Sequence, residues 1–184
     1  MNQGIRFTGF GGQGIILAGY VTGKAASLYD NLNATLTQNY GPESRGGACS
    51  AQLIISDEPV SYPELIQPDI LVALSQEGYY KYKDELKTNG ILLIEDEMVY
   101  PEKLRPDIRL YDIPAGQLAE KLGKRVVTNM IILGFLVSVT KVVSEQAMKE
   151  AIRTSVPPGT EELNLKAYWT GLEYGNKIIT TDYH

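Results

Sequence analysis

A short apolar segment, a glycine-rich turn and a helical stretch follow one another near the start of the chain. Residues 5–8 predict a β-strand, residues 9–14 carry a GxGxxG spacing, and residues 15–26 have the apolar periodicity of a helix. Backbone N–H groups at the start of such a helix favour anions. The spacing alone fits an anion site and a tight strand-to-helix turn about equally well.

This turn provides the first set of candidate binding residues, because glycine tolerates positive φ and lets a ligand approach the backbone. The set consists of Gly9, Gly11, Gly12, Gln13 and Gly14. A phosphate or a carboxylate is the kind of ligand that this arrangement favours.

Two further segments predict strands that pair with each other. Residues 34–40 alternate in polarity, residues 48–56 are largely apolar, and only residues 41–47 separate them. A connection of this length is too short for a crossover helix. We therefore expect an antiparallel hairpin.

The remainder of the chain alternates apolar strands with helices. Residues 69–75 and 90–95 have the composition of strands covered on both faces, and residues 109–113 predict a last strand. Helices are expected near residues 78–86, 115–122, 129–142, 145–153 and 161–177. We expect one α/β domain over residues 1–184, with three α/β/α layers and a mostly parallel, mixed sheet that contains one antiparallel hairpin. Thr128 is expected to be the N-cap of its helix.

Charge and composition exclude several classes of function. The 184 residues carry a formal net charge of −5, and lysine and arginine do not cluster, which argues against a nucleic-acid surface. The longest apolar run, residues 130–139, is far shorter than the roughly 20 residues of a membrane span. No secretory signal is visible, so we expect a cytoplasmic protein without a membrane segment.

The chain offers few groups for catalysis or metal binding. His184 is its only histidine and Cys49 its only cysteine. A Ser-His-Asp triad, a Cys-His pair and a histidine-bearing metal site are therefore not expected, and neither is an iron–sulfur cluster held by this chain alone. We predict no catalytic residue and no metal ligand, and we expect Cys49 to be a small buried residue.

The segment between the two hairpin strands holds a second set of candidate binding residues. They are Glu43, Ser44, Arg45, Gly46 and Gly47. The Arg45 guanidinium can hold a carboxylate or a phosphate through two parallel hydrogen bonds. The alternative is that Arg45 pairs with Glu43 or with a neighbouring chain.

Polar residues also follow the predicted parallel strands, at the edge where open α/β sheets bind ligands. Residues 75–77 and 95–96 follow two of these strands, and Asn129 comes directly after the predicted cap of a helix. Each of them is more commonly a capping or surface residue than a ligand. They become candidates for binding only if the fold brings them together with the glycine turn.

A nicotinamide dinucleotide site would need an acidic residue at the end of the second strand, to hold a ribose. The chain has Asn39 and Tyr40 there, and Asp30 comes before the strand. A stand-alone NAD(P)-binding protein is therefore the less favoured interpretation.

Four segments together resemble the gamma subunit of 2-oxoacid:ferredoxin oxidoreductases, which is equivalent to one domain of the fused pyruvate:ferredoxin oxidoreductases. The segments are Gly9-Phe10-Gly11-Gly12-Gln13-Gly14, Tyr40-Gly41-Pro42-Glu43-Ser44-Arg45-Gly46-Gly47, Ser75-Gln76-Glu77, and Asn129-Met130 with Leu133-Gly134. Their order and spacing cover residues 5 to about 140. Phe10 and the Tyr40 segment look more similar to the 2-oxoglutarate type than to the pyruvate type.

The resemblance implies an enzyme that decarboxylates a 2-oxoacid on thiamine diphosphate, passes electrons through iron–sulfur clusters to ferredoxin, and releases an acyl-CoA. This chain has no Gly-Asp-Gly thiamine and magnesium motif and one cysteine. Thiamine diphosphate, magnesium and the clusters are therefore expected only on partner subunits, namely alpha, beta and a ferredoxin-like delta subunit. The isolated chain should be inactive.

The resemblance also implies a ligand for the two candidate sets. In the fused relatives the equivalent domain lies near the place where coenzyme A reaches the thiamine, so coenzyme A is the anion expected at the glycine turn, Arg45 and Asn129. A purely structural assembly subunit, whose turn binds nothing, is the alternative. The sequence leaves open which 2-oxoacid is used, how many subunit types assemble, and whether the isolated chain forms a homodimer.

Overall fold

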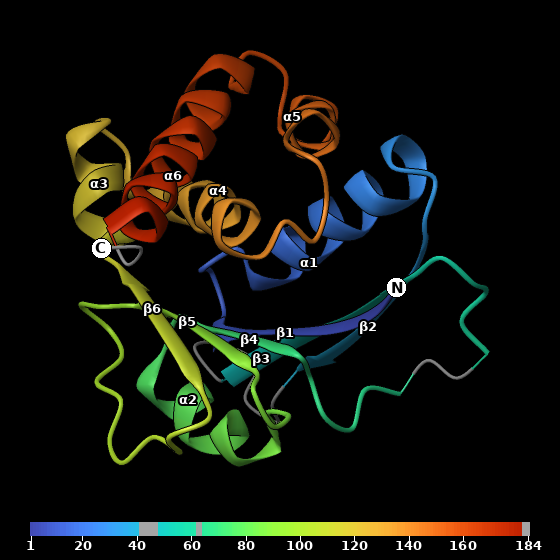
Figure 1. The fold of residues 1–184 in the computed structure, drawn as a ribbon. Coiled ribbons are helices and arrows are strands. Elements are labelled where there is room, and N and C mark those ends of the chain that lie inside the picture. Colours follow the sequence, from blue (N-terminus) through green and yellow to red (C-terminus); the bar gives the residue numbers. More distant parts are fainter. Residues whose placement is uncertain (41–47, 62–63, 182–184) are drawn as a thin grey trace.

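The computed structural model describes residues 1–40, 48–61 and 64–181 of the chain. Its strands are β1 (Asn2–Phe10), β2 (Asn33–Tyr40), β3 (Ala48–Ser56), β4 (Ile70–Ala73), β5 (Ile91–Glu95) and β6 (Arg109–Ile113). Its α-helices are α1 (Ile15–Lys24), α2 (Gln76–Tyr82), α3 (Ala115–Lys121), α4 (Thr128–Thr140), α5 (Glu145–Arg153) and α6 (Glu161–Thr181). The described strands form one sheet in the order β2-β3-β1-β4-β5-β6, with α2 on one face and the other five helices on the opposite face (Figure 1).

The sheet is mixed, and among the described strands only β3 runs against the others. β1, β4, β5 and β6 pair in parallel, whereas β3 pairs antiparallel with both β1 and β2. β2 and β3 form the expected hairpin, with Asn33 opposite Ser56 and Tyr40 opposite Cys49. The predicted fold class is therefore confirmed: three layers, a mostly parallel sheet and one antiparallel hairpin.

The main core lies between the sheet and the layer of five helices. Strand residues such as Phe7, Leu53 and Val72 are fully buried in it. In α4, every residue from 129 to 138 is buried. A helix that is buried on all sides belongs in a protein interior, and α4 lies between the sheet and α6 (Figure 1).

Two glycines lie where α4 and α6 cross. A Cβ on Gly134 would lie 2.6 Å from the backbone nitrogen of Leu172, and one on Gly171 would lie 2.7 Å from the carbonyl carbon of Ile131. Real Cβ atoms do not approach backbone atoms so closely. Gly134, which is part of one of the resemblance motifs, is therefore a helix-packing residue in this fold.

A smaller core lies on the opposite face of the sheet, beneath α2. Leu71, Leu92 and Tyr79 are fully buried or nearly so there, and Tyr82 is 7% exposed. This second core holds α2 on the sheet, so both faces of β4 and β5 are covered, as their continuous apolar sequences predict.

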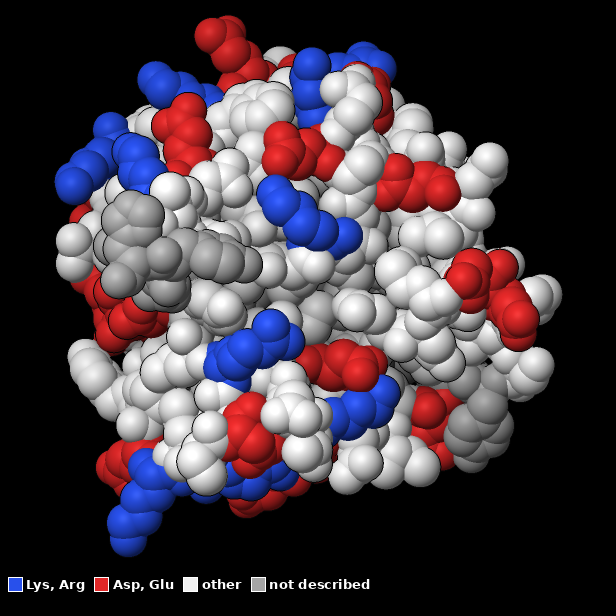
Figure 2. Space-filling view, in the orientation of Figure 1, with Lys and Arg blue, Asp and Glu red and all other residues white. Residues whose placement is uncertain are grey.

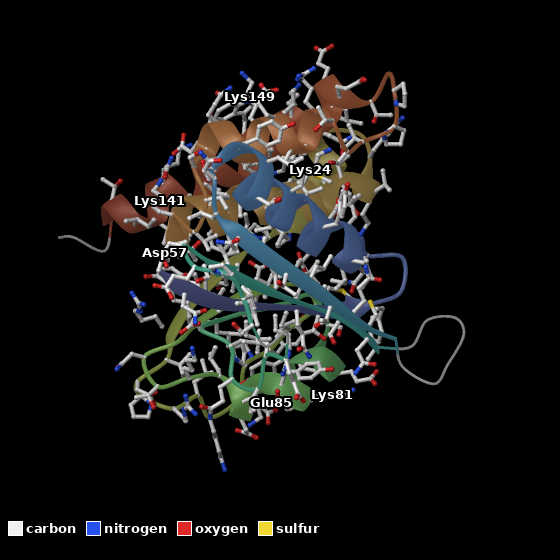
Figure 3. The ribbon with its side chains drawn as sticks, turned by 90° about the vertical axis from the view of Figure 1, so that its right-hand side faces the viewer. Lys24, Asp57, Lys81, Glu85, Lys141 and Lys149 are labelled. Carbon is white, nitrogen blue, oxygen red and sulfur yellow. The ribbon has the colours of Figure 1, made fainter. Side chains whose placement is uncertain are left out.

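One cation is buried on this same face. Arg6 of β1 pairs with Glu85, donates to the Leu65 carbonyl oxygen at 2.9 Å, and lies 4.4 Å from the centre of the Tyr82 ring. The Arg6 side chain is only 4% exposed, and its Nε has no hydrogen-bond partner among the described residues. Figure 3 shows Glu85 beneath the sheet beside α2, on the opposite side from Lys24 and Lys149 of the helical layer.

The prediction that Thr128 is the N-cap of its helix is wrong. Thr128 is the first residue of α4, and its φ of −53° is helical. A 3₁₀ turn over Arg125–Val127 leads directly into the helix, so the Thr128 hydroxyl donates to the Arg125 carbonyl oxygen at 2.6 Å and does not cap. Val127 occupies the cap position.

Lysine and arginine are mixed with aspartate and glutamate on the face of the molecule that Figure 2 shows. Figure 2 shows both signs interspersed on the visible face, without a large single-sign patch among the described residues there. This face does not provide the continuous positive potential that a phosphate backbone requires. Among the described helices, none has the length and apolarity that crossing a membrane requires.

Candidate functional site

The glycine turn joins β1 to α1 at the carboxyl edge of the parallel strands. Gln13 closes this turn: its N–H donates to the Phe10 carbonyl oxygen at 3.2 Å, and the Phe10 N–H donates to Gln13 Oε1 at 2.6 Å. Gln13 Nε2 donates to the Leu74 carbonyl oxygen at 3.0 Å, which ties the turn to the end of β4. The oxygen and the nitrogen of the Gln13 side-chain amide therefore both have partners within the fold. The turn can offer a ligand only its backbone groups.

The glycines of the turn have different roles. Gly9 is buried, and a Cβ there would come within 2.8 Å of Ile15 Cδ1, so this glycine permits close packing. Gly12 and Gly14 have φ values of 92° and 73°, in the left-handed region that costs other residues about 1–2 kcal/mol. Gly11 and Gly12 are exposed, and a Cβ on Gly12 would meet nothing within 4 Å.

The N-terminus of α1 is open toward these exposed glycines. Gly14 occupies its cap position, so no side chain caps it, and its first turn contains no acidic residue. The first N–H groups of a helix have no partner within the helix, and the helix dipole adds partial positive charge. This end of α1 therefore favours an anion.

Asn129 lies behind the turn, at the start of α4. It is 5% exposed, and a Cβ on Gly14 would come within 2.8 Å of Asn129 Cγ. The absence of a side chain at Gly14 thus lets the first turn of α4 pack against the first turn of α1. The structure brings together Asn129 and the glycine turn, which the sequence had placed in separate segments.

A cavity of about 150 Å³ lies between the glycine turn and the start of α4. Its lining includes Gly12, Gln13, Leu74, Glu95, Arg125 and Thr128. These residues come from the β1–α1 turn, from the ends of β4 and β5, and from the 3₁₀ turn before α4 together with the first residue of α4. Sequence reasoning missed Arg125, because a single arginine in a short turn has no spacing signal.

Glu95 is a buried ionisable residue of this cavity. It is 2% exposed, and its Oε1 accepts a hydrogen bond from the Gly116 N–H at 3.1 Å. Its Oε2 is buried and has no hydrogen-bond partner among the described residues. Burial raises the pKa of Glu95 above its usual range, and the neighbouring carboxylates of Glu97 and Asp96 raise it further.

The polar residues after β4 have partners within the fold. Ser75 Oγ accepts from the Gly78 N–H at 3.1 Å and caps α2. Both ends of the Gln76 amide bond to the backbone of Tyr100. Glu77 is exposed, and none of these three side chains lines the cavity. Of the residues expected at this edge, Glu95 therefore meets the glycine turn, and residues 75–77 do not.

The second candidate set, Glu43, Ser44, Arg45, Gly46 and Gly47, lies outside the described residues. The strands on either side of that set end at the edge that carries the glycine turn. Ala48, the first residue of β3, pairs with Phe10, the last residue of β1.

The strand order differs from that of a nicotinamide dinucleotide site. In that fold the strand after the first helix lies beside the first strand, whereas β3 lies between β1 and β2 here. Asp30, the acidic residue nearest to the required spacing, accepts hydrogen bonds from the N–H and the hydroxyl of Ser144 at 2.7 and 2.6 Å. Asp30 thus joins the start of β2 to the start of α5.

Two known proteins match this chain along nearly their whole length. The family model of pyruvate ferredoxin/flavodoxin oxidoreductases matches residues 4–174. The 2-oxoglutarate synthase subunit KorC of Methanocaldococcus jannaschii is 48% identical over 180 residues, which cover 97% of this chain and 96% of that protein. The gamma subunit of the keto/oxoacid ferredoxin oxidoreductase from Geobacter sulfurreducens superimposes with a TM-score of 0.84 at 41% identity, over 94% of this chain and 95% of that one.

A more distant solved structure has the same fold within a longer chain. It is the 2-oxoglutarate:ferredoxin oxidoreductase from Magnetococcus marinus, solved with 2-oxoglutarate, coenzyme A and succinyl-CoA bound. The TM-score is 0.83 at 23% identity, and the match covers 96% of this chain but 31% of that one. The chain therefore belongs to the pyruvate ferredoxin/flavodoxin oxidoreductase family, as a gamma-type subunit of a 2-oxoacid:ferredoxin oxidoreductase.

Proposed function

We propose that this chain serves a 2-oxoglutarate:ferredoxin oxidoreductase and helps to hold coenzyme A at the carboxyl edge of its sheet. The assembled enzyme would decarboxylate 2-oxoglutarate oxidatively, form succinyl-CoA and pass the electrons to ferredoxin. The name of the relative at 48% identity, a 2-oxoglutarate synthase subunit, supports this choice of 2-oxoacid. This chain would contribute binding and assembly, and the reacting groups would belong to its partners.

The exposed glycine turn beside the start of α1 is the observation that supports the coenzyme A role. Gly12 is exposed at positive φ beside the uncapped start of α1. Arg125 adds a guanidinium to the cavity lining, and Arg45 would add a second one from the segment between β2 and β3. The phosphates of coenzyme A are anions of the kind that helix N-termini and arginines bind.

We expect the assembled enzyme to be specific and the isolated chain to be inactive. Ferredoxin reduction by the assembled enzyme should be at least about tenfold faster with 2-oxoglutarate than with pyruvate, because pyruvate lacks the distal carboxylate that a dedicated site pairs with charge. The purified complex should also contain one chain with a thiamine motif and one with ferredoxin-like cysteine spacing. Equal rates with both 2-oxoacids would contradict the 2-oxoglutarate assignment.

Two substitutions test the coenzyme A role in the assembled enzyme. Arg45→Ala removes a charged hydrogen-bond donor, and Gly12→Val places a branched side chain where backbone must face the ligand. Each is expected to weaken coenzyme A binding about 10- to 100-fold in calorimetry, the effect of losing a hydrogen bond to a charged group. Unchanged affinity in both variants would leave the purely structural subunit as the better description.

Gly159→Val is the matched control for Gly12→Val. Gly159 has a φ of 86°, close to the 92° of Gly12, and a Cβ there would also meet nothing within 4 Å. It lies in the turn between α5 and α6, away from the cavity. Both variants therefore carry similar backbone strain, and only Gly12→Val should change the affinity for coenzyme A.

A further inference from the structure

The unpaired carboxyl oxygen of Glu95 indicates that a ligand could also form a hydrogen bond inside the cavity, in addition to its contacts with the glycine turn. Native proteins leave few buried polar atoms without a partner, and those that remain need a specific explanation. Oε1 of Glu95 bonds to the Gly116 N–H, whereas its buried Oε2 has no partner among the described residues. Glu95 is one of the residues that line the cavity beside the glycine turn.

Two side chains of the cavity lining that can donate hydrogen bonds, those of Gln13 and Arg125, have partners other than Glu95. Arg125 Nη1 pairs with Glu120 at 2.7 Å, and its Nη2 lies 3.9 Å from Glu97. Gln13 uses its Nε2 to donate to the Leu74 carbonyl oxygen. Neither of these two side chains forms a hydrogen bond with Glu95 Oε2, which has no partner among the described residues.

Charge and lining restrict what can enter the cavity. A carboxylate repels phosphate, so the phosphates of a ligand would stay at the exposed backbone of Gly11 and Gly12. Leu74, Met98 and Val126 make part of the lining apolar. At roughly 30 Å³ for each water molecule, the cavity has room for about five waters, which suits a ring or an amide segment and excludes a whole coenzyme A.

We propose that this cavity binds an uncharged part of the ligand that carries an N–H group, and that this N–H donates to the Glu95 carboxyl. The identification of the ligand as coenzyme A rests on the proposed function. Coenzyme A has two uncharged segments with N–H donors, the amino group of its adenine and the amides of its pantetheine arm. The glycine turn would then bind the phosphates of coenzyme A outside the cavity, and Glu95 would accept the hydrogen bond from its N–H group inside the cavity.

Adenosine and pantetheine, which carry no phosphate, are the probes for the two segments. We expect one of them to bind the full chain and to shift the backbone amide resonance of Gly116, whose N–H is bonded to Glu95. Glu95→Gln should weaken this binding about tenfold or more, because the new amide group presents a donor to a donor. Glu77→Gln is the matched control: it makes the same substitution at an exposed residue of the same sheet edge, outside the cavity lining, and should change the affinity less than twofold.

Stability provides a measurement that does not depend on any ligand. A raised carboxyl pKa means that the folded state loses stability as pH rises through the range between the unfolded and the folded pKa of Glu95. Glu95→Gln should therefore raise the melting temperature at pH 7 by roughly 2–4 °C, and this gain should disappear below about pH 4. If Glu95 serves in binding, Glu95→Gln should weaken binding and raise the melting temperature. If Glu95 serves only the structure, the same substitution should lower the melting temperature.

The outcomes separate this inference from the coenzyme A role. If Gly12→Val and Arg45→Ala weaken coenzyme A binding but neither fragment binds, or Glu95→Gln binds as the parent does, the inference about Glu95 is wrong and the coenzyme A role stands. A second outcome is that the fragments bind through Glu95 while Gly12→Val and Arg45→Ala leave coenzyme A binding unchanged. The inference about Glu95 then stands, and the coenzyme A role is wrong. A Glu95→Gln chain that is less stable or does not fold would overturn the inference.

Discussion

Gly134→Ala should lower the free energy of unfolding by about 3 kcal/mol, the upper part of the range for overpacked cores. The added Cβ would lie 2.6 Å from the backbone nitrogen of Leu172 and still closer to the carbonyl oxygen of Tyr168. Backbone atoms of α6 cannot move aside as a side chain can, so the two helices must separate. The expected fall in melting temperature is roughly 6–12 °C, measured by calorimetry or by circular dichroism.

Gly23→Ala in α1 is the matched control for this prediction. The nearest atom to a Cβ on Gly23 is Leu53 Cδ1 at 3.1 Å, the end of a flexible side chain. Alanine also favours a helix over glycine by about 1 kcal/mol, so this variant should melt within a few degrees of the parent chain. A Gly134→Ala chain that melts as high as the Gly23→Ala chain would mean that α4 and α6 are not packed as closely as described.

Glu85→Ala should destabilise the fold by about 2–3 kcal/mol, because it leaves the Arg6 cation buried without its carboxylate. The Arg6 side chain is 4% exposed, and its remaining contacts are the Leu65 carbonyl oxygen and the face of the Tyr82 ring. The estimate lies below the value for a fully buried pair because Glu85 is 42% exposed and partly solvated. Urea denaturation of the purified chain measures the effect.

Replacing Arg6, the other member of this ion pair, should destabilise the fold less than replacing Glu85. Arg6→Met keeps an apolar stem of similar length and leaves Glu85 free to contact water, so we expect a loss of about 1 kcal/mol. Glu120→Ala, which breaks an ion pair with both side chains more than half exposed, should change stability by less than about 0.5 kcal/mol. If Arg6→Met costs more than Glu85→Ala, the buried cation is a net stabilising group and our account of the pair is wrong.

Local patterns in the sequence were sufficient for most of the fold. The bounds predicted for β3, β6 and α5 agree with the structure, because each is a short periodic segment between clear turn signals. The short connection between residues 40 and 48 was sufficient to predict the antiparallel hairpin, since no crossover helix fits there. Thr128 was misassigned because cap geometry depends on where the preceding 3₁₀ turn ends, which residue type alone does not reveal.

The candidate site could be predicted only in part. The glycine turn was visible because its spacing is local, and the four resemblance motifs indicated the family. The sequence could place Glu95 and Asn129 near the same edge but not beside the turn, because that contact depends on how β5 and α4 pack against β1. Arg125 was missed because a single arginine in a short turn has no spacing signal.

The sequence by itself determined the order of the elements and the position of the glycine turn, because both follow from residue types and short spacings. That partner subunits hold the cofactors follows from the family resemblance and stays a prediction. Only the tertiary structure decided that Glu95, Gly12 and Arg125 share one cavity and that Gly134 touches the backbone of α6. It also decided that Arg6 is buried beneath α2. Such contacts join residues that are far apart in the chain, and their geometry is set by the packing of whole helices and strands.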